Sequence, residues 1–549
     1  MRSSIFLFLA AATAATVAFA QTPAAEQPDF ELFAARPNEE RLADKLTGLR
    51  IVATAAQLSE PGFPADGVDT SRVAWMPPEE IIFAVAGFMD EPVSRESLDR
   101  LVMAVRLYAR THGKTFVSIY LPPQDITGGY VQIVASEATH SGDVAVHGAK
   151  YFSEKSYRSA VKQEDGKPID EARLRADVEW LNRNPFRRAV IAAEPGEEPG
   201  TTRLALRVQE LTPWQLSAGY DNTGTKTTGE ERVSANVLWG NALGLGHQMS
   251  YRFTSDPELE HSRSHSLSYA ADLPWRHSVS VFAAWSDIKS IMPEPFTQEG
   301  SSGQAGVRYV IPLRGTRAAW VQSVTLGGDF KYSDNTLEFA TMPVTDNVTH
   351  IVQGSVTYAL NVTGEGQQAG VQATVFASPG GLSGRNHGRY FDASRNGAKA
   401  EYVYGRIDAQ YSRALPARFF WSSTASLQVA SGALLGSEQL NGGGAYAVRG
   451  FRENTAFGDE GVVWNNELHL PGYSFKAGSD NLDTFVFVDA ASLRMRVDDD
   501  TFELSSAGVG VNYTWKRNFT LRAAYGWQLK KLPGSRDDGH GHVSVNVSW

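Results

Sequence analysis

An arginine in a glycine-rich segment and a later aspartate are the side chains whose chemistry would matter most. Arg449 follows Gly442-Gly443-Gly444 and precedes Gly450, and these glycines give the backbone freedom to fold back through a crowded interior. A guanidinium stays charged in a protein interior and needs a carboxylate there, because an unpaired buried charge is strongly destabilising. Asp489 is the candidate partner. A solvated loop arginine and a strand-end aspartate remain the alternative interpretation of these residues.

The sequence around Asp489 indicates which way its side chain points. Phe485, Phe487 and Asp489 alternate with Val486 and Val488. Successive side chains of a strand lie on opposite faces, so the two phenylalanines and the aspartate share one face. In a membrane barrel this face would line the lumen, and the valines would contact lipid.

Catalytic chemistry finds little support in the sequence. Ser383 and His387 lie close together, but Gly381-Leu382-Ser383-Gly384 lacks the spacing of a nucleophile elbow and is typical of a loop. The chain has no cysteine, which excludes thiolate metal sites and cysteine nucleophiles. Nothing in it resembles a phosphate-binding loop. We therefore expect no catalytic residue, no cofactor and no nucleotide.

Metal binding is equally weakly supported. His261 with His265, and His540 with His542, lack the third ligand and the helical context of a metal site. The run Asp498–Asp500 is typical of a solvated hairpin tip rather than of a calcium site. We expect no metal centre.

The N-terminus predicts export from the cytoplasm. Arg2 precedes the apolar stretch Ile5–Ala10, and Ala18-Phe19-Ala20 resembles a cleavage site, so residues 1–20 are expected to be a signal peptide. No later apolar run is long enough for a spanning helix, so any structure that crosses a membrane would be a closed β-barrel. The formal net charge of -10 disfavours nucleic acid as a partner.

Helical and strand patterns alternate in the first part of the mature chain, which predicts two small α+β domains at residues 47–137 and 138–210. Ser94 is the expected N-cap of a helix in the first domain, and a helix of the second is expected to start at Asp170. The other expected elements are strands at Phe116–Leu121, Tyr130–Ala135, Val144–His147, Ala189–Ala192 and Leu204–Val208, and a short helix at Glu154–Val161.

From Trp214 to Trp549 the dominant pattern is the alternation of a β-strand. Apolar residues take every second position in the segments 507–515, 519–527 and 543–549. A soluble sandwich also shows this alternation, but the export signal and the aromatic residues at strand ends favour a membrane barrel. At about 20 residues for each strand and its turn, residues 211–549 would form about 16 antiparallel strands.

Several motifs resemble those of a known family. They are Leu121-Pro122-Pro123-Gln124, Leu181-Asn182-Arg183-Asn184-Pro185, the segment Pro195–Thr201, Asp221-Asn222-Thr223-Gly224, Gly240-Asn241-Ala242-Leu243-Gly244 and Val448-Arg449-Gly450-Phe451. Together they span nearly all of the mature chain and are similar to those of the outer-membrane transporters of two-partner secretion, the haemolysin and filamentous-haemagglutinin type secretion/activation proteins. The resemblance implies an all-β transmembrane barrel in the outer membrane, preceded by two POTRA domains in the periplasm.

The resemblance also implies roles for individual residues. The run Val448, Arg449, Gly450 and Phe451 resembles the tip of the long sixth extracellular loop, and Asp489, beside Phe485 and Phe487, resembles the lumen-facing partner of its arginine. With this match, a loop locked inside the lumen becomes the preferred interpretation of Arg449.

The function implied by the resemblance is protein transport. Such a translocase captures an unfolded partner exoprotein with its POTRA domains and secretes it, with or without activating it, through a pore with porin activity. It works as a monomer surrounded by outer-membrane lipid. The alternative is an assembly factor that inserts β-barrel proteins into the outer membrane, but two POTRA-like domains rather than a longer array argue against that role.

One segment departs from the family pattern. Family members commonly begin with a plug helix and a long linker, whereas residues 21–46 offer a short helix only at Asn38–Leu46. A helical residue advances only about 1.5 Å, so a plug helix and a spanning linker would be cramped here. We therefore expect no removable helical plug.

Overall fold

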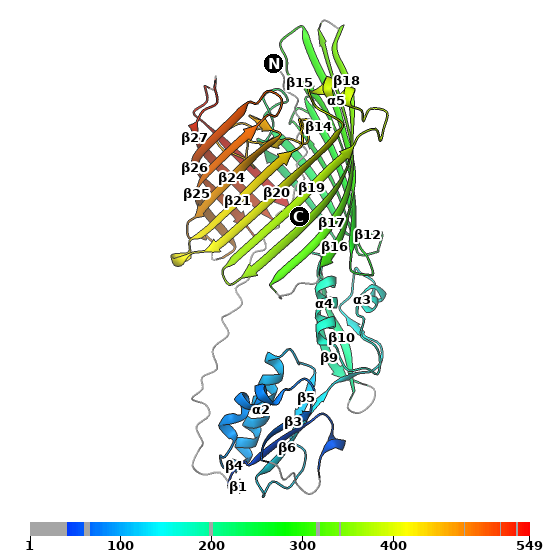
Figure 1. Cartoon of the computed structure of the whole chain (residues 1–549), viewed down its shortest axis with the longest axis vertical. Coiled ribbons are helices and arrows are strands. Elements are labelled where there is room, and N and C mark those ends of the chain that lie inside the picture. Colours follow the sequence, from blue (N-terminus) through cyan, green and yellow to red (C-terminus); the bar gives the residue numbers. More distant parts are fainter. Residues whose placement is uncertain are drawn as a thin grey trace. The chain divides into compact units, whose positions relative to one another are not determined.

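The computed structural model describes residues 41–59, 66–196, 201–313, 319–339, 342–476, 478–516, 518–533 and 536–549, without the side chains of residues 335–346. The chain divides between Leu211 and Thr212 into two compact units (Figure 1). The predicted signal peptide and residues 21–40 lie outside the described residues.

The first α+β domain is a four-stranded sheet covered by two helices, with strand order β3-β2-β6-β5. Its core is formed by the buried apolar face of the sheet and of helix α2, where Leu101 and Val105 are almost fully buried. The elements are β1 (Arg41–Ala43), β2 (Gly48–Val52), the 3-10 turn η2 (Ala55–Gln57), β3 (Gly67–Arg72), α1 (Pro78–Val85), η3 (Ala86–Phe88), β4 (Val93–Ser94), α2 (Arg95–Thr111), β5 (Val117–Tyr120) and β6 (Tyr130–Glu137).

Ser94 caps helix α2, as the sequence predicts. The Ser94 hydroxyl accepts a hydrogen bond from the Ser97 amide at 3.1 Å, and the Ser97 hydroxyl accepts one from the Ser94 amide at 2.8 Å. The two side chains thus satisfy amides that the first turn of a helix leaves without intrahelical partners.

Ser94→Ala is expected to destabilise the first domain by about 1 kcal/mol, the usual contribution of an N-cap. Urea unfolding followed by the helical circular dichroism signal would measure this loss as a lower midpoint. Ser118→Ala, at an exposed position of β5, is the matched control and should leave the midpoint unchanged. Equal midpoints for both variants would show that the cap contributes nothing.

The helix predicted at Asn38–Leu46 is wrong over its described part. Arg41–Ala43 forms the strand β1, which pairs antiparallel with β4, and Ala43 and Leu46 are buried in the core of the first domain. Packing against that core outweighs the modest helical propensity of the segment. Residues 38–40 lie outside the described residues.

The second α+β domain is built around β10, which pairs antiparallel with β9 and parallel with β7 and β8. The carboxylate of Glu210, at the end of β10, accepts a hydrogen bond from the Tyr157 hydroxyl at 2.6 Å and one from the Lys150 amide at 2.9 Å. Burial and this carboxylate raise the pKa of Tyr157 far above its usual range. The elements are β7 (Thr139–His140), β8 (Ala145–His147), α3 (Glu154–Ala160), α4 (Glu171–Leu181), β9 (Arg187–Pro195) and β10 (Thr201–Glu210).

The second unit is a closed barrel of 16 antiparallel strands (Figure 1), which confirms the fold class predicted from the sequence. It closes where β11 pairs with β28, from Ser217 opposite Ser548 to Asp221 opposite Ser544. The barrel strands are β11 (Trp214–Asp221), β12 (Arg232–Ala242), β13 (His247–Ser255), β14 (Ser262–Asp272), β15 (Ser278–Ser290), β16 (Phe296–Leu313), β17 (Trp320–Phe339), β18 (Met342–Gly364), β19 (Gln367–Pro379), β20 (Glu401–Ala414), β21 (Phe420–Ala430), β24 (Glu460–His469), β25 (Asp480–Arg494), β26 (Thr501–Trp515), β27 (Phe519–Lys530) and β28 (Gly539–Ser548).

Four short elements lie between the barrel strands in the described part of the chain. They are α5 (Gly388–Ser394), between β19 and β20, and the strand pair β22 (Leu440–Asn441) and β23 (Phe457–Gly458), between β21 and β24; the 3-10 turn η4 (Pro416–Arg418) joins β20 to β21. Within the described part of the chain, no helix is both long enough and apolar enough to cross a bilayer.

The alternation predicted for the last strands matches the barrel wall. Val509, Tyr525 and Val543, from the expected apolar faces, are all exposed on the outside of the barrel. Trp214 and Trp239 stack on each other with ring centroids 4.8 Å apart, at the end of the barrel where the chain enters β11. Paired aromatic rings at strand ends are typical of the interfacial girdle of a membrane barrel.

Candidate functional site

The long loop between β21 and β24, residues 431–459, folds back inside the barrel; we call it the inner loop. Its tip, residues 445–453, carries the motif that the sequence singles out. Val448, Arg449 and Phe451 are at most 3% exposed, and the two apolar side chains among them belong to a buried cluster with residues of β24, β25 and β26. The tip of the inner loop is therefore buried against the inner face of the wall.

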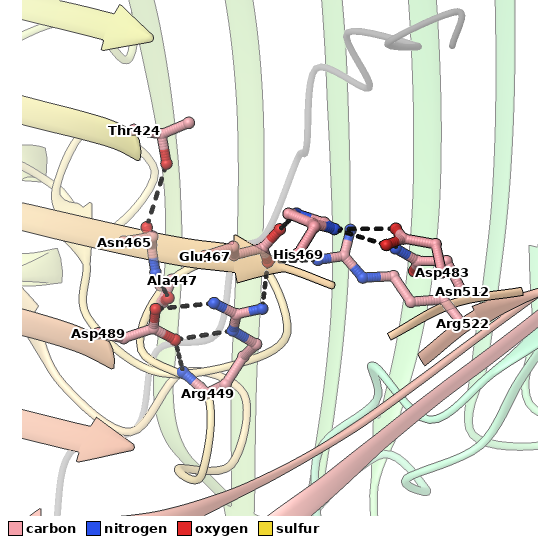
Figure 2. A network of polar contacts seen from close by, with 10 residues as sticks. All are labelled: Thr424, Ala447, Arg449, Asn465, Glu467, His469, Asp483, Asp489, Asn512 and Arg522. Atoms are coloured by element: carbon pink, nitrogen blue, oxygen red, sulfur yellow. Dashed lines mark hydrogen bonds and ion pairs between the residues drawn. The ribbon is translucent and has the colours of Figure 1, made fainter. Parts of the chain in front are cut away.

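Arg449 is held by two carboxylates of the wall. Its Nε donates to Asp489 Oδ2 at 2.7 Å and its Nη2 to Asp489 Oδ1 at 2.8 Å, so the pair is bidentate (Figure 2). The Arg449 amide also donates to Asp489 Oδ2, at 3.1 Å, and Nη1 donates to Glu467. Asp489 is fully buried. A buried arginine with this geometry fixes both the position and the orientation of the loop tip.

Glu467, on β24, connects Arg449 to a second arginine. Its Oε1 accepts hydrogen bonds from Arg449 and, at 3.0 Å, from Arg522 Nη2 on β27 (Figure 2). Its Oε2 lies 3.1 Å from His469 Nε2. The tip is therefore tied to β24, β25 and β27 through one connected set of charges.

The set of charges continues away from the tip. His469 Nδ1 lies 2.9 Å from the carboxylate oxygens of Asp483, which also accepts a hydrogen bond from Asn512 at 3.0 Å. Every group in this row has a partner of complementary charge or polarity (Figure 2). Such a satisfied network favours one geometry of the wall around Arg449.

The phenylalanines beside Asp489 form a platform under the guanidinium. The Arg449 Cζ atom lies 3.7 Å from the ring centroid of Phe487, and Phe485 is nearby at 5.7 Å. Across the strand pair, Phe485 and Phe487 face Gly510 and Gly508 of β26. A Cβ on Gly508 would lie 2.4 Å from the Phe487 ring, so glycine there makes room for the platform.

The structure thus brings together Arg449, Asp489, Phe485 and Phe487, all singled out by the sequence. It also adds residues that sequence reasoning missed: Glu467, His469 and Arg522. The signal that could have found two of them is the alternation in β24, where Asn465, Glu467 and His469 share the inward face while Trp464 and Leu468 are exposed.

The base of the inner loop has a separate anchor at Glu438, which is 1% exposed. Its carboxylate accepts hydrogen bonds from Lys331 on β17 at 2.5 Å, from Tyr404 on β20 at 2.7 Å and from Gln353 on β18 at 3.1 Å. Three wall strands therefore converge on one loop carboxylate, well away in sequence from the strands that hold the tip.

Asp459, at the end of the inner loop, is the third anchor. It is fully buried and accepts two hydrogen bonds from Arg395, at 2.5 and 2.7 Å, and one each from the amides of Leu434 and Arg496 at 2.9 Å. This carboxylate joins the start and the end of the inner loop to the neighbouring loops on both sides.

The structure also places the weaker candidates from the sequence. Ser383 Oγ lies 3.1 Å from His350 Nδ1. His540 and His542 pack edge to face, and among the described residues no group of three or more histidine, aspartate or glutamate side chains is arranged to hold a metal ion. Asp499 is paired with Arg494 at the hairpin tip.

A 16-stranded barrel that follows two α+β domains and holds a loop in its lumen is the architecture of an outer-membrane transporter. The sequence profile of the haemolysin secretion/activation protein ShlB/FhaC/HecB family matches residues 200–513, and the chain belongs to this family.

Individual relatives agree with this assignment. The outer membrane transporter CdiB of Dickeya dadantii (strain 3937) is 23% identical over 454 residues, which cover 81% of this chain and 79% of the relative. The hemolysin transporter protein ShlB of Serratia marcescens is 25% identical over 521 residues, covering 89% and 87%. The solved structure of CdiB from Escherichia coli matches with a TM-score of 0.70 at 18% identity, over 96% of this chain and 93% of that one.

The family, the outer-membrane location and the transport function predicted from the sequence are confirmed. The chain is an outer-membrane transporter of two-partner secretion, and two small α+β domains precede its barrel. An assembly factor for other barrels is the weaker alternative.

Proposed function

We propose that this transporter captures one large exoprotein in the periplasm and secretes it as an unfolded chain or hairpin through the lumen, acting as a monomer. Its relatives include transporters named for haemolysins, which are secreted proteins. Folding of the exoprotein at the cell surface supplies the driving force, so the chain needs neither catalytic residues nor a nucleotide. Export of the cognate exoprotein into the medium, with and without the transporter, tests this function directly.

The observation that carries the proposal is the docked tip of the inner loop. Arg449 makes three hydrogen bonds to Asp489 and one to Glu467, all from inside the barrel. A polypeptide that passes through the lumen meets this loop. The residues Val448 to Phe451 therefore act as a lock that closes the pore at rest and shifts when the substrate enters.

In this proposal the two α+β domains are POTRA domains in the periplasm, and capture rests on an open strand edge in the second of them. The Leu211 amide donates to the Phe186 carbonyl at 2.8 Å, which fixes the hydrogen-bonding pattern between β9 and β10. The backbone groups of Ala189, Ile191 and Ala193 consequently point to the outer edge of β9. Among the described strands, β10 is the one that pairs with β9.

The start of that edge is already occupied. The side-chain amide of Asn182 accepts from the Ala189 amide at 2.6 Å and donates to the Ala189 carbonyl at 3.0 Å, as a neighbouring strand would. Ile191 and Ala193, further along, retain outward N–H and C=O groups. An extended substrate segment adding to this edge gains main-chain hydrogen bonds with little demand on its sequence.

The corresponding edge of the first POTRA domain is less open. The Ala138 amide donates to the Phe116 carbonyl at 2.9 Å, so Val117 and Ile119 direct their backbone groups outward from β5. Arg106 of α2 donates to the Ile119 carbonyl at 2.7 and 3.2 Å. This guanidinium blocks part of the β5 edge, so we assign substrate capture to β9.

Ala193→Pro is expected to reduce export of the exoprotein severely. Proline removes the outward N–H of Ala193 and leaves the hydrogen bonds between β9 and β10 in place, since an edge strand tolerates proline on its open side. Val117→Pro makes the same change at the β5 edge and serves as the matched control, with export retained. Normal export by Ala193→Pro would rule out the β9 edge as the capture site.

A further inference from the structure

The inward side chains of β27 become smaller from Arg522 to Gly526, which lies at the tip of the inner loop. Arg522, Ala524, Gly526 and Gln528 share this face, because Tyr525 and Trp527 are exposed on the outside. Arg522 reaches Glu467, and Ala524 packs against Phe485 and Phe487. Gly526 comes next, where no side chain is present.

The backbone of the tip occupies the space that a side chain at position 526 would take. A Cβ on Gly526 would lie 2.8 Å from the Gly450 nitrogen and 2.9 Å from the carbonyl carbon of Arg449. A Cβ on Gly450 would in turn lie 2.8 Å from the Gly526 oxygen. Backbone atoms at these distances cannot move aside as the end of a flexible side chain can. The two glycines therefore allow a direct contact between the two backbones.

Two further hydrogen bonds hold the tip backbone beside this contact. Gln528, the next inward residue of β27, donates from Nε2 to the Gly450 carbonyl at 2.8 Å. On the other side, Asn465 of β24 donates to the Ala447 carbonyl. The residues that flank Arg449 are thus fixed by the wall independently of the guanidinium.

We propose that Gly526 is a positioning residue for the lock: its missing side chain forms the seat that lets Arg449 reach Asp489. This inference rests on the proposed gating role of the inner loop and deepens it. The seat and the ion pair are two separate requirements for docking. The Arg449 amide is itself bonded to Asp489 at 3.1 Å, so lifting the backbone off β27 also pulls this bond apart.

The test compares full-length Gly526→Ala with Gly541→Ala in planar bilayers. Gly541, on the neighbouring strand β28, has room for a methyl group, since an added Cβ would lie 3.5 Å from the Tyr525 ring, an ordinary van der Waals distance. Gly526→Ala should increase the fraction of time spent in the open state about tenfold, in line with the usual cost of overpacking. Gly541→Ala should behave as the wild type. Both changes suit a β-strand, so both barrels should insert normally.

A second variant and a second measurement keep the test independent of folding. Gln528→Leu removes the donor to Gly450 without adding bulk at the seat, and a smaller increase in open time is expected. Trypsin added to intact cells should cut after Arg449 in Gly526→Ala but not in Gly541→Ala, because a displaced tip exposes this buried arginine.

The outcomes separate the seat from the proposed function. In one outcome, Arg449→Ala opens the pore, whereas Gly526→Ala inserts fully and keeps wild-type conductance and trypsin resistance. This outcome refutes the role of Gly526 as the seat and leaves the gating role of the inner loop intact. If neither Arg449→Ala nor removal of the tip changes conductance or export, the gating role fails, and the seat with it. A longer open time for Gly526→Ala, together with an unchanged open time for Gly541→Ala, supports the role of Gly526 as the seat of the tip.

Discussion

Replacing Arg449 with alanine is expected to remove most export of the exoprotein while the barrel still inserts into the outer membrane. The variant leaves the buried Asp489 without the arginine that pairs with it, and breaking a buried ion pair in this way typically costs about 3–5 kcal/mol. The docked tip loses that stabilisation, whereas no strand of the wall loses a backbone hydrogen bond. Exoprotein in the medium and barrel in the membrane fraction would be measured on the same cultures.

Matched variants sharpen this experiment. Arg449→Lys should recover only part of the export, because an ammonium cannot make the two parallel bonds to Asp489. Arg413→Ala, at an exposed position of β20, is the control for loss of an arginine and should export normally. If both Arg449→Ala and Asp489→Ala export at wild-type levels, the lock has no functional role.

Removal of the tip should convert the closed barrel into a large, steadily open pore. Asn441 and Phe457 pair directly across β22 and β23, so deletion of residues 442–454 leaves Thr455-Ala456 as a two-residue hairpin turn. Without the tip, a wide lumen with polar inward residues conducts ions. Single-channel recording should show long openings, in contrast to the brief or rare openings of the intact chain.

Deletion of residues 21–40 is the comparison for this experiment. It stops short of β1, whose residues Arg41–Ala43 belong to the first domain. We expect little change in conductance, because that segment is polar, contains proline and is short. A large steady conductance after this deletion, but not after removal of the tip, would show that the N-terminal segment closes the pore and would overturn the assignment to the inner loop.

Alternation in the sequence was sufficient to place Asp489, Phe485 and Phe487 on one face of a strand, because that inference depends only on neighbouring residues. The same holds for helix α2, whose cap and apolar face are local features. Glu467, Arg522 and Gly526 could not be found in this way. Their roles exist only because a loop returns through the lumen and brings Gly450 against β27.

Tertiary contacts also explain the one element that the sequence misassigned and the anchors that it did not suggest. Arg41–Ala43 is a strand because β4 offers it a partner. Glu438 and Lys331 are 107 positions apart, and nothing local marks either residue as half of a buried ion pair. The strands β17 and β18, with 20 and 23 residues, are also longer than the roughly ten residues that a membrane requires.

The base and the tip of the inner loop are bound to different strands of the barrel wall. This difference implies that the path through the barrel lies on one side of the lumen. Glu438 is bound by β17, β18 and β20, whereas Arg449 is bound by β24 and β25. If the tip alone were released, the base of the loop would stay bound through Glu438. The tip would then swing away from the wall about the glycines Gly442–Gly444. The space that it vacates borders β24 to β27. The substrate polypeptide would then pass Glu467, Arg522 and Asp489. The charged side chains that hold the tip at rest would thus line the path of the substrate during transport.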